Sequence, residues 1–437
     1  MENQGIRDAR QLGVPKMLVL GLQHMFAMFG ATILVPALTG LSVSATLLFA
    51  GLGTLLFHFL AKGRVPAFLG SSFAYLAGYA AIAPNGEAAL LPYACVGVAC
   101  SGLLYLVLAA LVKSFGTHKV MRFFPPVVTG PIIICIGMTL ANSAINNCTG
   151  HWAVALLAIV TVVVFNIWGR GMLKIIPILM GVLVSYVFAA LLGQMDFSGV
   201  AAAPWIGLPV KMENTVFSLI GNCDTNLLVT AIIAIMPIAF ATMIEHIGDI
   251  CAISSTVGEN FIENPGLHRT LLGDGLATAL ASLFGAPANT TYGENTGVLA
   301  LTKVYDPRVV RIAAIFAIIA SFCPKFSALV AAMPAGTIGG VSLILYGMIS
   351  AIGVRNLVEN HVDLAQSRNV IVVSLILSLG LGITFSAAGA ISFTAGAITL
   401  KFSGLAVAAI VGIVVNAILP GKDYTFSSDY SNGKKER

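Results

Sequence analysis

Three acidic residues stand where the chain is otherwise strongly apolar. Glu245 follows the uncharged run 227–244, and Asp249 comes four residues later, so both carboxylates share one face of a predicted helix. Glu294 lies in a separate polar stretch, NTTYGENTG, at 289–297. If these segments cross a membrane, a carboxylate there is costly and by default indicates a pathway for substrate or protons. The structural alternative is a carboxylate that caps a neighbouring helix end.

Aromatic residues near these acids are candidates for holding a flat ligand. Phe73 lies in the stretch LGSSFAYLAG, at a position that corresponds to Glu294 in the repeat described below, so we expect it to offer its ring as a platform. Tyr292 and Tyr346 either supply a hydroxyl to a polar ligand or anchor the packing. The sequence leaves both possibilities open.

Other polar residues are expected to support the ones that touch a ligand. A histidine inside a membrane span usually donates to a backbone carbonyl or a carboxylate, so we expect His24 and His246 to orient their neighbours. Ser72 and Asn295 are assigned the same supporting role. Asp274 lies near the cytoplasmic end of a predicted span, where we expect a structural role facing a loop.

The sequence carries no visible apparatus for chemistry beyond proton movement. It contains no P-loop, G-x-S-x-G, H-E-x-x-H or dinucleotide fingerprint, so an enzyme is not expected. Its seven cysteines are scattered without a C-x-x-C pair, which indicates neither a disulfide framework nor a zinc site. We therefore expect no metal and no organic cofactor.

The composition requires lipid as the main solvent of the chain. Charged residues make up 9% of the 437 residues and apolar residues 58%, whereas an ordinary soluble chain has roughly 25% charged residues. The net charge of +5 is spread over short loops and forms no basic stripe, which excludes nucleic-acid binding. The fold class that we predict is an all-α polytopic membrane protein.

Apolar segments of about 20 residues predict fourteen transmembrane spans. With both termini in the cytoplasm, all but three of the 23 Lys and Arg residues fall on the cytoplasmic side, as the positive-inside rule requires. The third and tenth spans are short and polar. The spans are expected at 16–38, 43–61, 66–83, 88–112, 121–141, 151–168, 173–194, 225–253, 268–284, 287–302, 308–331, 335–353, 369–387 and 400–419.

The two halves of the chain resemble each other. Gln23-His24 corresponds to Glu245-His246, and Pro66-Ala67 to Pro287-Ala288, in the same order and at similar spacing. Seven spans in each half make an inverted repeat, which is the layout of secondary transporters. We expect the third and tenth spans to be broken into short antiparallel strands followed by half-helices, whose free N–H groups point at one cavity.

These motifs resemble those of the nucleobase/ascorbate transporter family of nucleobase–cation symporters, and most closely the bacterial uracil permeases. The resemblance rests on LQHMFAMFGATILVP (22–36), VPAFLGSSFA (65–74), NPGLHRTLLGDGL (264–276), PANTTYGENTG (287–297) and GGVSLILYG (339–347). The family signature appears as Glu294-Asn295-Thr296-Gly297 through Thr302-Lys303.

The resemblance implies a division into a core domain and a gate domain. The core is formed by 16–115 and 224–331, and the gate by 116–223 and 332–420, with cytoplasmic tails at 1–15 and 421–437. The gate is expected to carry a homodimer contact. The protein is expected in the inner (cytoplasmic) membrane of a bacterium, embedded in the lipid bilayer.

The resemblance also implies a uracil:proton symporter that works by alternating access. The nucleobase is expected to bind the carboxylates of Glu245 and Glu294 and the backbone at Phe73 and Gly293. Ala31, Tyr292 and Tyr346 are expected to surround it.

The coupling ion is expected to be a proton, carried by Glu245, Asp249 or Glu294. Uracil is neutral, so three clustered carboxylates need not balance a substrate charge, and at least one of them is expected to hold a proton.

One position departs from the uracil permeases. They carry a histidine four residues after the first glutamate, where this chain has Asp249, as in relatives that transport purines such as xanthine or uric acid. Glutamate at 294 favours the pyrimidine branch. A purine symporter therefore remains an alternative, and an anion transporter of the same architecture is a further one, against which Glu245 and Glu294 argue.

Overall fold

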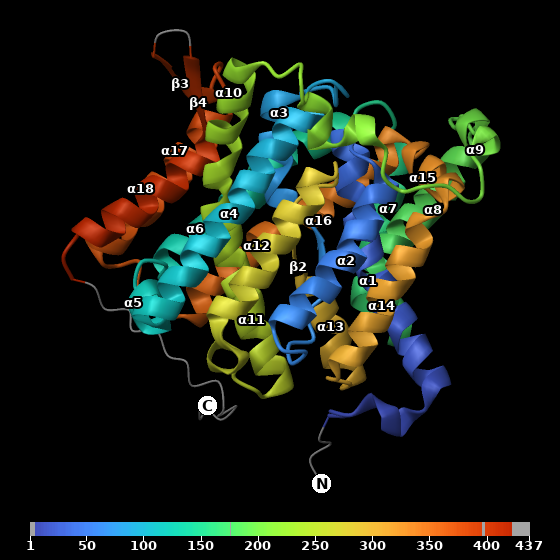
Figure 1. The fold of residues 1–437 in the computed structure, drawn as a ribbon, viewed down its shortest axis with the longest axis horizontal. Helices are drawn as coiled ribbons and strands as arrows, with labels where there is room; N and C mark the ends of the chain where they lie inside the picture. Colours follow the sequence, from blue (N-terminus) through green and yellow to red (C-terminus); the bar gives the residue numbers. More distant parts are fainter. Residues whose placement is uncertain (1–4, 175, 396–397, 422–437) are drawn as a thin grey trace.

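The fold is predominantly helical, and the computed structural model describes residues 5–174, 176–395 and 398–421 (Figure 1). Helices in the first half are α1 (Val14–Thr39), α2 (Val43–Leu60), α3 (Leu76–Ile82), α4 (Leu91–Phe115), α5 (Thr117–Met121), α6 (Pro126–Cys148), α7 (Trp152–Trp168), α8 (Pro177–Leu191) and α9 (Ser198–Ala202). Helices in the second half are α10 (Thr225–Ile235), α11 (Ala239–Val257), α12 (Leu267–Leu283), α13 (Gly293–Thr302), α14 (Pro307–Ser321), α15 (Pro324–Ala331), α16 (Ala335–Glu359), α17 (Ser367–Thr384) and α18 (Gly404–Ile418).

Short strands and single turns connect these helices. The strands are β1 (Leu69–Ser71), β2 (Asn289–Thr291), β3 (Ala390–Ala395) and β4 (Ile398–Ser403). The 3-10 turns are η1 (Ala9–Leu12), η2 (Phe73–Tyr75), η3 (Gly171–Lys174), η4 (Met212–Asn214), η5 (Val216–Leu219) and η6 (Met236–Ile238), and η7 (Ile262–Gly266) is a wider turn.

Seven helical segments in the described part of the chain are long and apolar enough to cross a membrane. They are α1, α2, α4, α6, the run Thr225–Val257, α16 and α17, and the bent pair of α14 and α15 makes a possible eighth. Shorter apolar helices lie at Phe73–Ile82, Trp152–Trp168, Pro177–Leu191 and Gly404–Ile418. Every predicted span contains a helix, but length and composition of the helices do not by themselves establish fourteen crossings, and that number stays a prediction.

Besides the third and tenth spans, which contain β1 and β2, three predicted spans differ from continuous helices. The eleventh, 308–331, bends by 86° between α14 and α15, because Pro324 has no N–H with which to continue α14. Pro237 similarly interrupts the eighth span between α10 and α11. The fourteenth, 400–419, begins in strand β4, and its helix starts only at Gly404.

The hairpin before α18 was not expected. Strands β3 and β4 pair antiparallel, from Ala390 opposite Ser403 to Ala395 opposite Ile398. The β-branched and aromatic residues in 390–403 favour strands. The apolar residues from 400 onward are equally consistent with the start of a helix. The pattern of the sequence was therefore ambiguous here.

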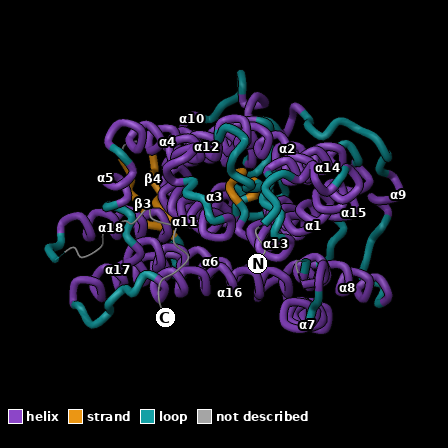
Figure 2. The backbone as a smooth tube through the Cα atoms, turned by 90° about the horizontal axis from the view of Figure 1, so that it is seen from below, coloured by secondary structure: helices purple, strands orange, loops and turns teal. Residues whose placement is uncertain are grey.

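The helices form two groups that lie side by side. In Figure 2, α6, α16, α7, α8 and α17 lie along one side, and α16 packs against α6, α7 and α8. The other group contains α1, α2, α4, α12 and α14, in which α4 packs on α12 and α2 packs on α12 and α14. The β1–β2 pair lies inside this second group, in contact with α1, α2, α11 and α12.

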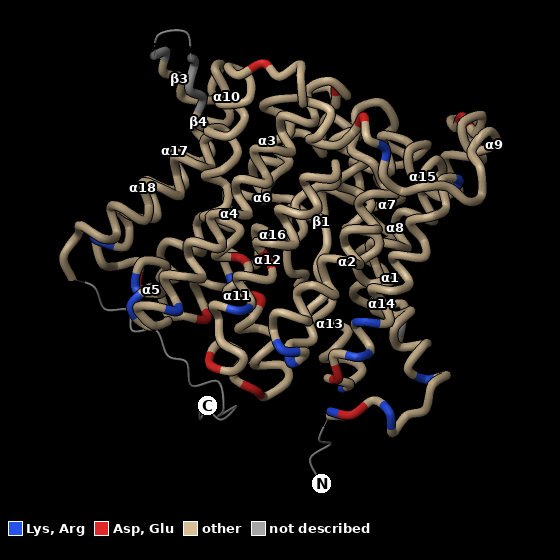
Figure 3. The backbone as a smooth tube through the Cα atoms, in the orientation of Figure 1, with Lys and Arg blue, Asp and Glu red and all other residues tan. Residues whose placement is uncertain are grey.

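The outer surface is apolar on many helices. Leu191 is 81% exposed, Ile418 75% and Trp168 69%, as expected for side chains that face lipid. Figure 3 shows Lys and Arg gathered mainly at one end of the molecule, around α5 and the ends of α2, α13 and α14. Charge is thus concentrated where the helices end.

Candidate functional site

The centre of the second helix group is a pair of three-residue strands from opposite halves of the chain. β1 and β2 are antiparallel, with Leu69 opposite Thr291 and Ser71 opposite Asn289. The pairing continues beyond both strands, since Ser72 N–H donates to Ala288 O at 2.9 Å. Each strand then passes directly into a helical turn, η2 followed by α3 on one side and α13 on the other.

Side chains of α2 and α12 satisfy the outer edges of this pair. Thr54 Oγ1 accepts from Leu69 N–H at 2.9 Å and lies 3.3 Å from its carbonyl oxygen. On the other edge, Thr278 Oγ1 donates to Asn289 O at 2.9 Å, and Asp274 Oδ1 accepts from Thr291 N–H at 3.0 Å. A lone strand pair among apolar helices would otherwise leave backbone groups without partners, which is costly.

Asp274 is therefore not a loop-facing residue, and that prediction is wrong. Its side chain is fully buried, at 0% exposure, behind β2 on α12. The prediction failed because distance along the chain from a span's end does not reveal what covers that part of the helix. The strand pair covers it.

Close approach of the backbone depends on two glycines. A Cβ added to Gly70 in β1 would lie 2.7 Å from the ring of Tyr292 and 2.8 Å from Thr32 Oγ1. One added to Gly53 in α2 would collide with the side chain of Asn289. Any larger residue at either position would force the strand pair away from its neighbours.

The three predicted acids come together where α11 packs against α13. Glu245, Asp249 and Glu294 are each partly exposed, while Ile244 and Ile250 on α11 are buried. A Cβ added to Gly293, at the start of α13, would lie 3.5 Å from Asp249 Oδ1. The acids thus face accessible space beside a helix start rather than the packed interior.

The starts of both half-helices lack side-chain caps. Neither Ser72 before η2 nor Tyr292 before α13 makes a capping hydrogen bond with its side chain. The first N–H groups of each helical turn have no acceptor within their own helix and carry partial positive charge. They are available to carbonyl oxygens of a ligand, beside carboxylates that accept from its N–H groups.

A chain of polar contacts runs from the partly exposed acids to the fully buried Asp274 on α12. Thr291 Oγ1 donates to Asp249 Oδ2 at 3.0 Å and lies 3.2 Å from His246 Nδ1. Nδ1 of His246 in turn lies 3.4 Å from Asp274 Oδ2, and both side chains are fully buried. In the tautomer with its hydrogen on Nδ1, His246 donates to the Thr291 hydroxyl, whose own hydrogen goes to an ionised Asp249.

His246 is also enclosed by aromatic rings. Its imidazole lies edge-on to Phe57 at 6.3 Å and to Tyr105 at 6.4 Å between ring centres. The supporting role predicted for His246 thus has specific partners. Thr291 and Asp274 were missed as members of the chain, since they lie far from His246 in sequence and no local pattern links them to it.

Phe73 and Tyr346 meet across the two helix groups. Their ring centres are 6.0 Å apart at an interplanar angle of 72°, an edge-to-face contact. Phe73 is 7% exposed and Tyr346, on α16, 1%. Between the two possibilities left open by the sequence, Tyr346 is engaged in packing in this structure.

Tyr292 anchors the strand pair. Its hydroxyl donates to Ser71 O at 2.7 Å and its N–H donates to Phe68 O at 2.9 Å. Of the two roles considered for this side chain, the contacts favour anchoring. Ala31, on α1, is buried at 1% exposure in the same apolar cluster.

Of the remaining residues predicted to support the site, Asn295 and His24 are hydrogen-bonded to each other, whereas the Ser72 side chain has no hydrogen-bond partner. Asn295 Nδ2 donates to His24 O at 3.0 Å and lies 3.2 Å from His24 Nδ1, which ties α13 to α1. Ser72 Oγ is buried without a hydrogen-bond partner. Within the described residues, no group of three or more His, Cys, Asp or Glu side chains could hold a metal ion.

The arrangement has counterparts among known proteins. The sequence profile of a protein family, described as the permease family, matches residues 15–389. The chain belongs to this permease family. The resemblance inferred from the motifs is thereby confirmed, as is the expectation of a multi-pass transporter rather than an enzyme.

Curated relatives match this permease over nearly its whole length. A uracil permease of Bacillus caldolyticus is 43% identical over 95% of this chain and 94% of its own. One from Bacillus subtilis (strain 168) is 40% identical over 96% and 95%, and one from Escherichia coli (strain K12) is 38% identical over 91% and 90%.

Solved structures with a similar fold are distant in sequence. The transmembrane domain of the cyanobacterial bicarbonate transporter BicA matches with a TM-score of 0.59 at 14% identity, covering 94% of this permease and 99% of that chain. SLC26A9 matches with a TM-score of 0.64 at 12% identity, covering 92% of this permease and 64% of that chain. At this identity the likeness concerns the fold alone.

Proposed function

We propose that this permease takes up nucleobases in symport with protons and that uracil is its substrate. The observation that carries the proposal is the meeting of Glu245 and Glu294 with two uncapped helix starts. The uracil permeases that match it at 38–43% identity over nearly full length support the same substrate.

Uracil matches the groups that the site offers. The two ring N–H groups of uracil donate to the carboxylates of Glu245 and Glu294, and its two carbonyls accept from the free N–H groups at Phe73 and Gly293. The ring lies against Phe73, with Tyr346, Tyr292 and Ala31 shaping the space around it. His24, His246, Ser72 and Asn295 hold these groups in place.

The membrane layout is proposed to be fourteen spans in a 7+7 inverted repeat. The pairing of β1 with β2 at corresponding positions of the two halves supports it. The group containing the strand pair is then the core domain (16–115 and 224–331), and the other is the gate (116–223 and 332–420). Rocking of one against the other exposes the site alternately to each side of a bacterial inner membrane, with both termini cytoplasmic and a homodimer formed through the gate.

Proton coupling is proposed to use the contacts around Asp249. A proton on Asp249 lets Glu245 stay ionised and accept from uracil, because two carboxylates this close do not both ionise cheaply. The path Asp249–Thr291–His246–Asp274 offers buried partners that stabilise either protonation state. Loss of this proton to the cytoplasm leaves neighbouring carboxylates ionised together, and their mutual repulsion disrupts the site and releases uracil. Each proton that enters the cell gains about 2.3 kcal/mol per 100 mV of membrane potential.

Competition for uptake separates the candidates. Purified protein in proteoliposomes with an imposed inward proton gradient should accumulate labelled uracil, and excess unlabelled uracil should compete more strongly than xanthine, uric acid or thymine. Stronger competition by xanthine would move the substrate to the purines, to which Asp249 points. Transport of bicarbonate or sulfate in place of uracil would favour an anion transporter of the same fold.

A further inference from the structure

The N-terminal strap, residues 5–12, crosses one end of the molecule and pairs with the chain just after α13. Ile6 N–H donates to Lys303 O at 2.7 Å, and Ile6 O accepts from Tyr305 N–H at 2.8 Å. The two hydrogen bonds form a short parallel bridge between Ile6 and Val304. The end of α13 is thereby fixed to the strap by hydrogen bonds between backbone groups, which do not depend on the side chains at these positions.

The next residue of the strap contacts a different helix. Arg7 Nη2 donates to Val257 O at 3.0 Å, and its guanidinium forms an ion pair with the Glu259 carboxylate. Val257 is the last residue of α11. Cations stabilise a helix C-terminus because the last carbonyls lack intrahelical partners. Arg7 therefore supplies the strap's polar link to α11.

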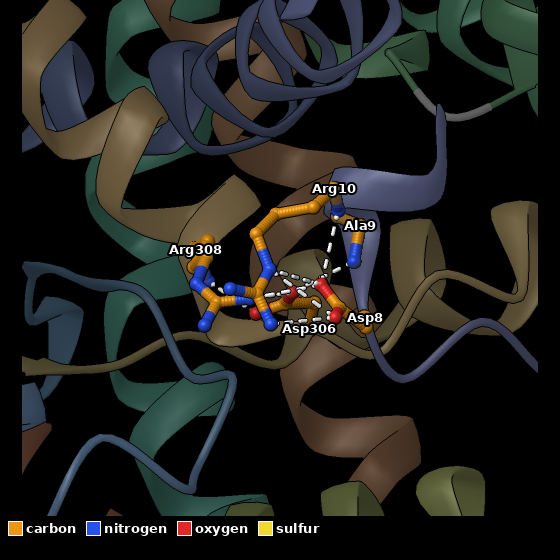
Figure 4. A network of polar contacts seen from close by, with 5 residues as sticks. All are labelled: Asp8, Ala9, Arg10, Asp306 and Arg308. Atoms are coloured by element: carbon orange, nitrogen blue, oxygen red, sulfur yellow. Dashed lines mark hydrogen bonds and ion pairs between the residues drawn. The ribbon is translucent and has the colours of Figure 1, made fainter. Parts of the chain in front are cut away.

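The following residues seat the strap on the start of α14 (Figure 4). Ala9 N–H donates to the buried carboxylate of Asp306 at 2.7 Å, and Asp8 accepts from the guanidiniums of Arg10 and Arg308, each at 2.9 Å. Asp306 also caps α14, accepting from Arg308 N–H. Ala9 is fully buried, so this part of the strap is an integral contact and not a surface association.

Protonation does not release the strap at physiological pH. The hydrogen bonds from the Arg10 side chain lower the pKa of Asp8 to about 2. Asp8 therefore stays ionised throughout the physiological range, and its contacts weaken only as the pH falls through that value.

The two helices that the strap joins are the ones that carry the site acids. Glu294 is the second residue of α13 and Asp249 lies on α11, each roughly two helical turns from the end that the strap holds. α13 has only ten residues, so a shift of its end moves Glu294 nearly as a rigid body.

We propose that the strap sets the relative position of α11 and α13, and that Arg7 is a positioning residue for the carboxylate pair Glu245 and Glu294. This inference rests on the proposed function of those acids. Arg7 and Glu259 are 54% and 43% exposed, so their ion pair adds little to stability. Its effect is expected on the geometry of the site.

The test uses the full-length protein with Arg7→Ala, Glu259→Ala, the double variant and Arg7→Lys. Lys16→Ala, an exposed cation in the first turn of α1, is the matched control. Two quantities are measured: amide hydrogen exchange of the ligand-free protein in the last turns of α11 and α13, and the calorimetric Kd for uracil.

We expect both alanine variants to speed exchange in these turns and to raise the Kd about threefold to tenfold, as remote positioning residues do. The double variant should be no worse than Arg7→Ala, Arg7→Lys should recover part of the affinity, and Lys16→Ala should match the parent. Faster exchange confined to the strap, or an unchanged Kd, would overturn the inference. If the parent itself binds no uracil, the proposed function fails, and the exchange data alone decide whether the strap couples the two helices.

Discussion

The hydroxyl of Thr291 donates a hydrogen bond of 3.0 Å to the carboxylate of Asp249. This contact joins the short strand pair to the acidic face of α11, because Thr291 is the last residue of β2. The same hydroxyl lies 3.2 Å from His246 and the N–H of Thr291 donates to Asp274. One threonine therefore connects the site acids to the buried polar residues behind them.

Replacing Glu245 or Glu294 with Ala is expected to abolish uracil binding while leaving a folded, membrane-inserted protein. Each replacement removes an acceptor for a ring N–H that would then be buried without a partner. Isothermal titration calorimetry measures the loss of binding. The control is Glu213→Ala, because the side chain of Glu213 is 74% exposed. Full binding by either site variant would contradict the assignment of that carboxylate.

Asp249→Asn is expected to bind uracil with weakened pH dependence and to exchange it across a membrane without accumulating it. The amide resembles a permanently protonated carboxylate, so the site is held in its binding state. Uptake and counterflow in proteoliposomes with an imposed pH gradient distinguish the two activities. Accumulation equal to that of the parent would pass the coupling role to Glu294 or His246.

Thr291→Val is expected to reduce gradient-driven uptake about fivefold, the scale of one lost hydrogen bond. Valine keeps the shape and the backbone pairing of β2 but breaks the link between Asp249 and His246. Thr291→Ser, which retains the hydroxyl, is the matched control and should transport like the parent. Equal uptake by the valine variant would show that the link has no part in coupling.

Phe73→Leu is expected to weaken uracil binding by roughly 1 kcal/mol, the scale of an aromatic contact. The backbone of residue 73 stays in place, so only the ring and its edge-to-face contact with Tyr346 are lost. Calorimetry on Phe73→Leu beside the exposed control Phe115→Leu measures the difference. Either a complete loss of binding or an unchanged Kd would contradict a role limited to the ring.

Asp274→Ala is expected to lower the free energy of unfolding by about 1–3 kcal/mol, because Thr291 N–H is left buried without an acceptor. Asp274→Asn should lose less, since an amide oxygen can still accept from that N–H. Thermal unfolding of the purified protein compares the two variants. Equal stability of parent and alanine variant would show that another acceptor replaces Asp274.

The sequence determined the class of protein and indicated which residues are candidates for the site. Its composition required a lipid environment, and the motifs around Glu245 and Glu294 identified the family. Asp249 was recognisable because positions four apart share a face of any α-helix. The short third and tenth segments were visible as polar breaks, and strands β1 and β2 lie there.

The tertiary structure alone decided which distant residues meet. The burial of Asp274 behind β2, the Phe73–Tyr346 contact and the bridge between Ile6 and Val304 each join residues far apart in the chain. No local periodicity encodes such contacts, because they depend on how whole helices pack. Local patterns fix which face of a helix is polar, and only packing decides what that face touches.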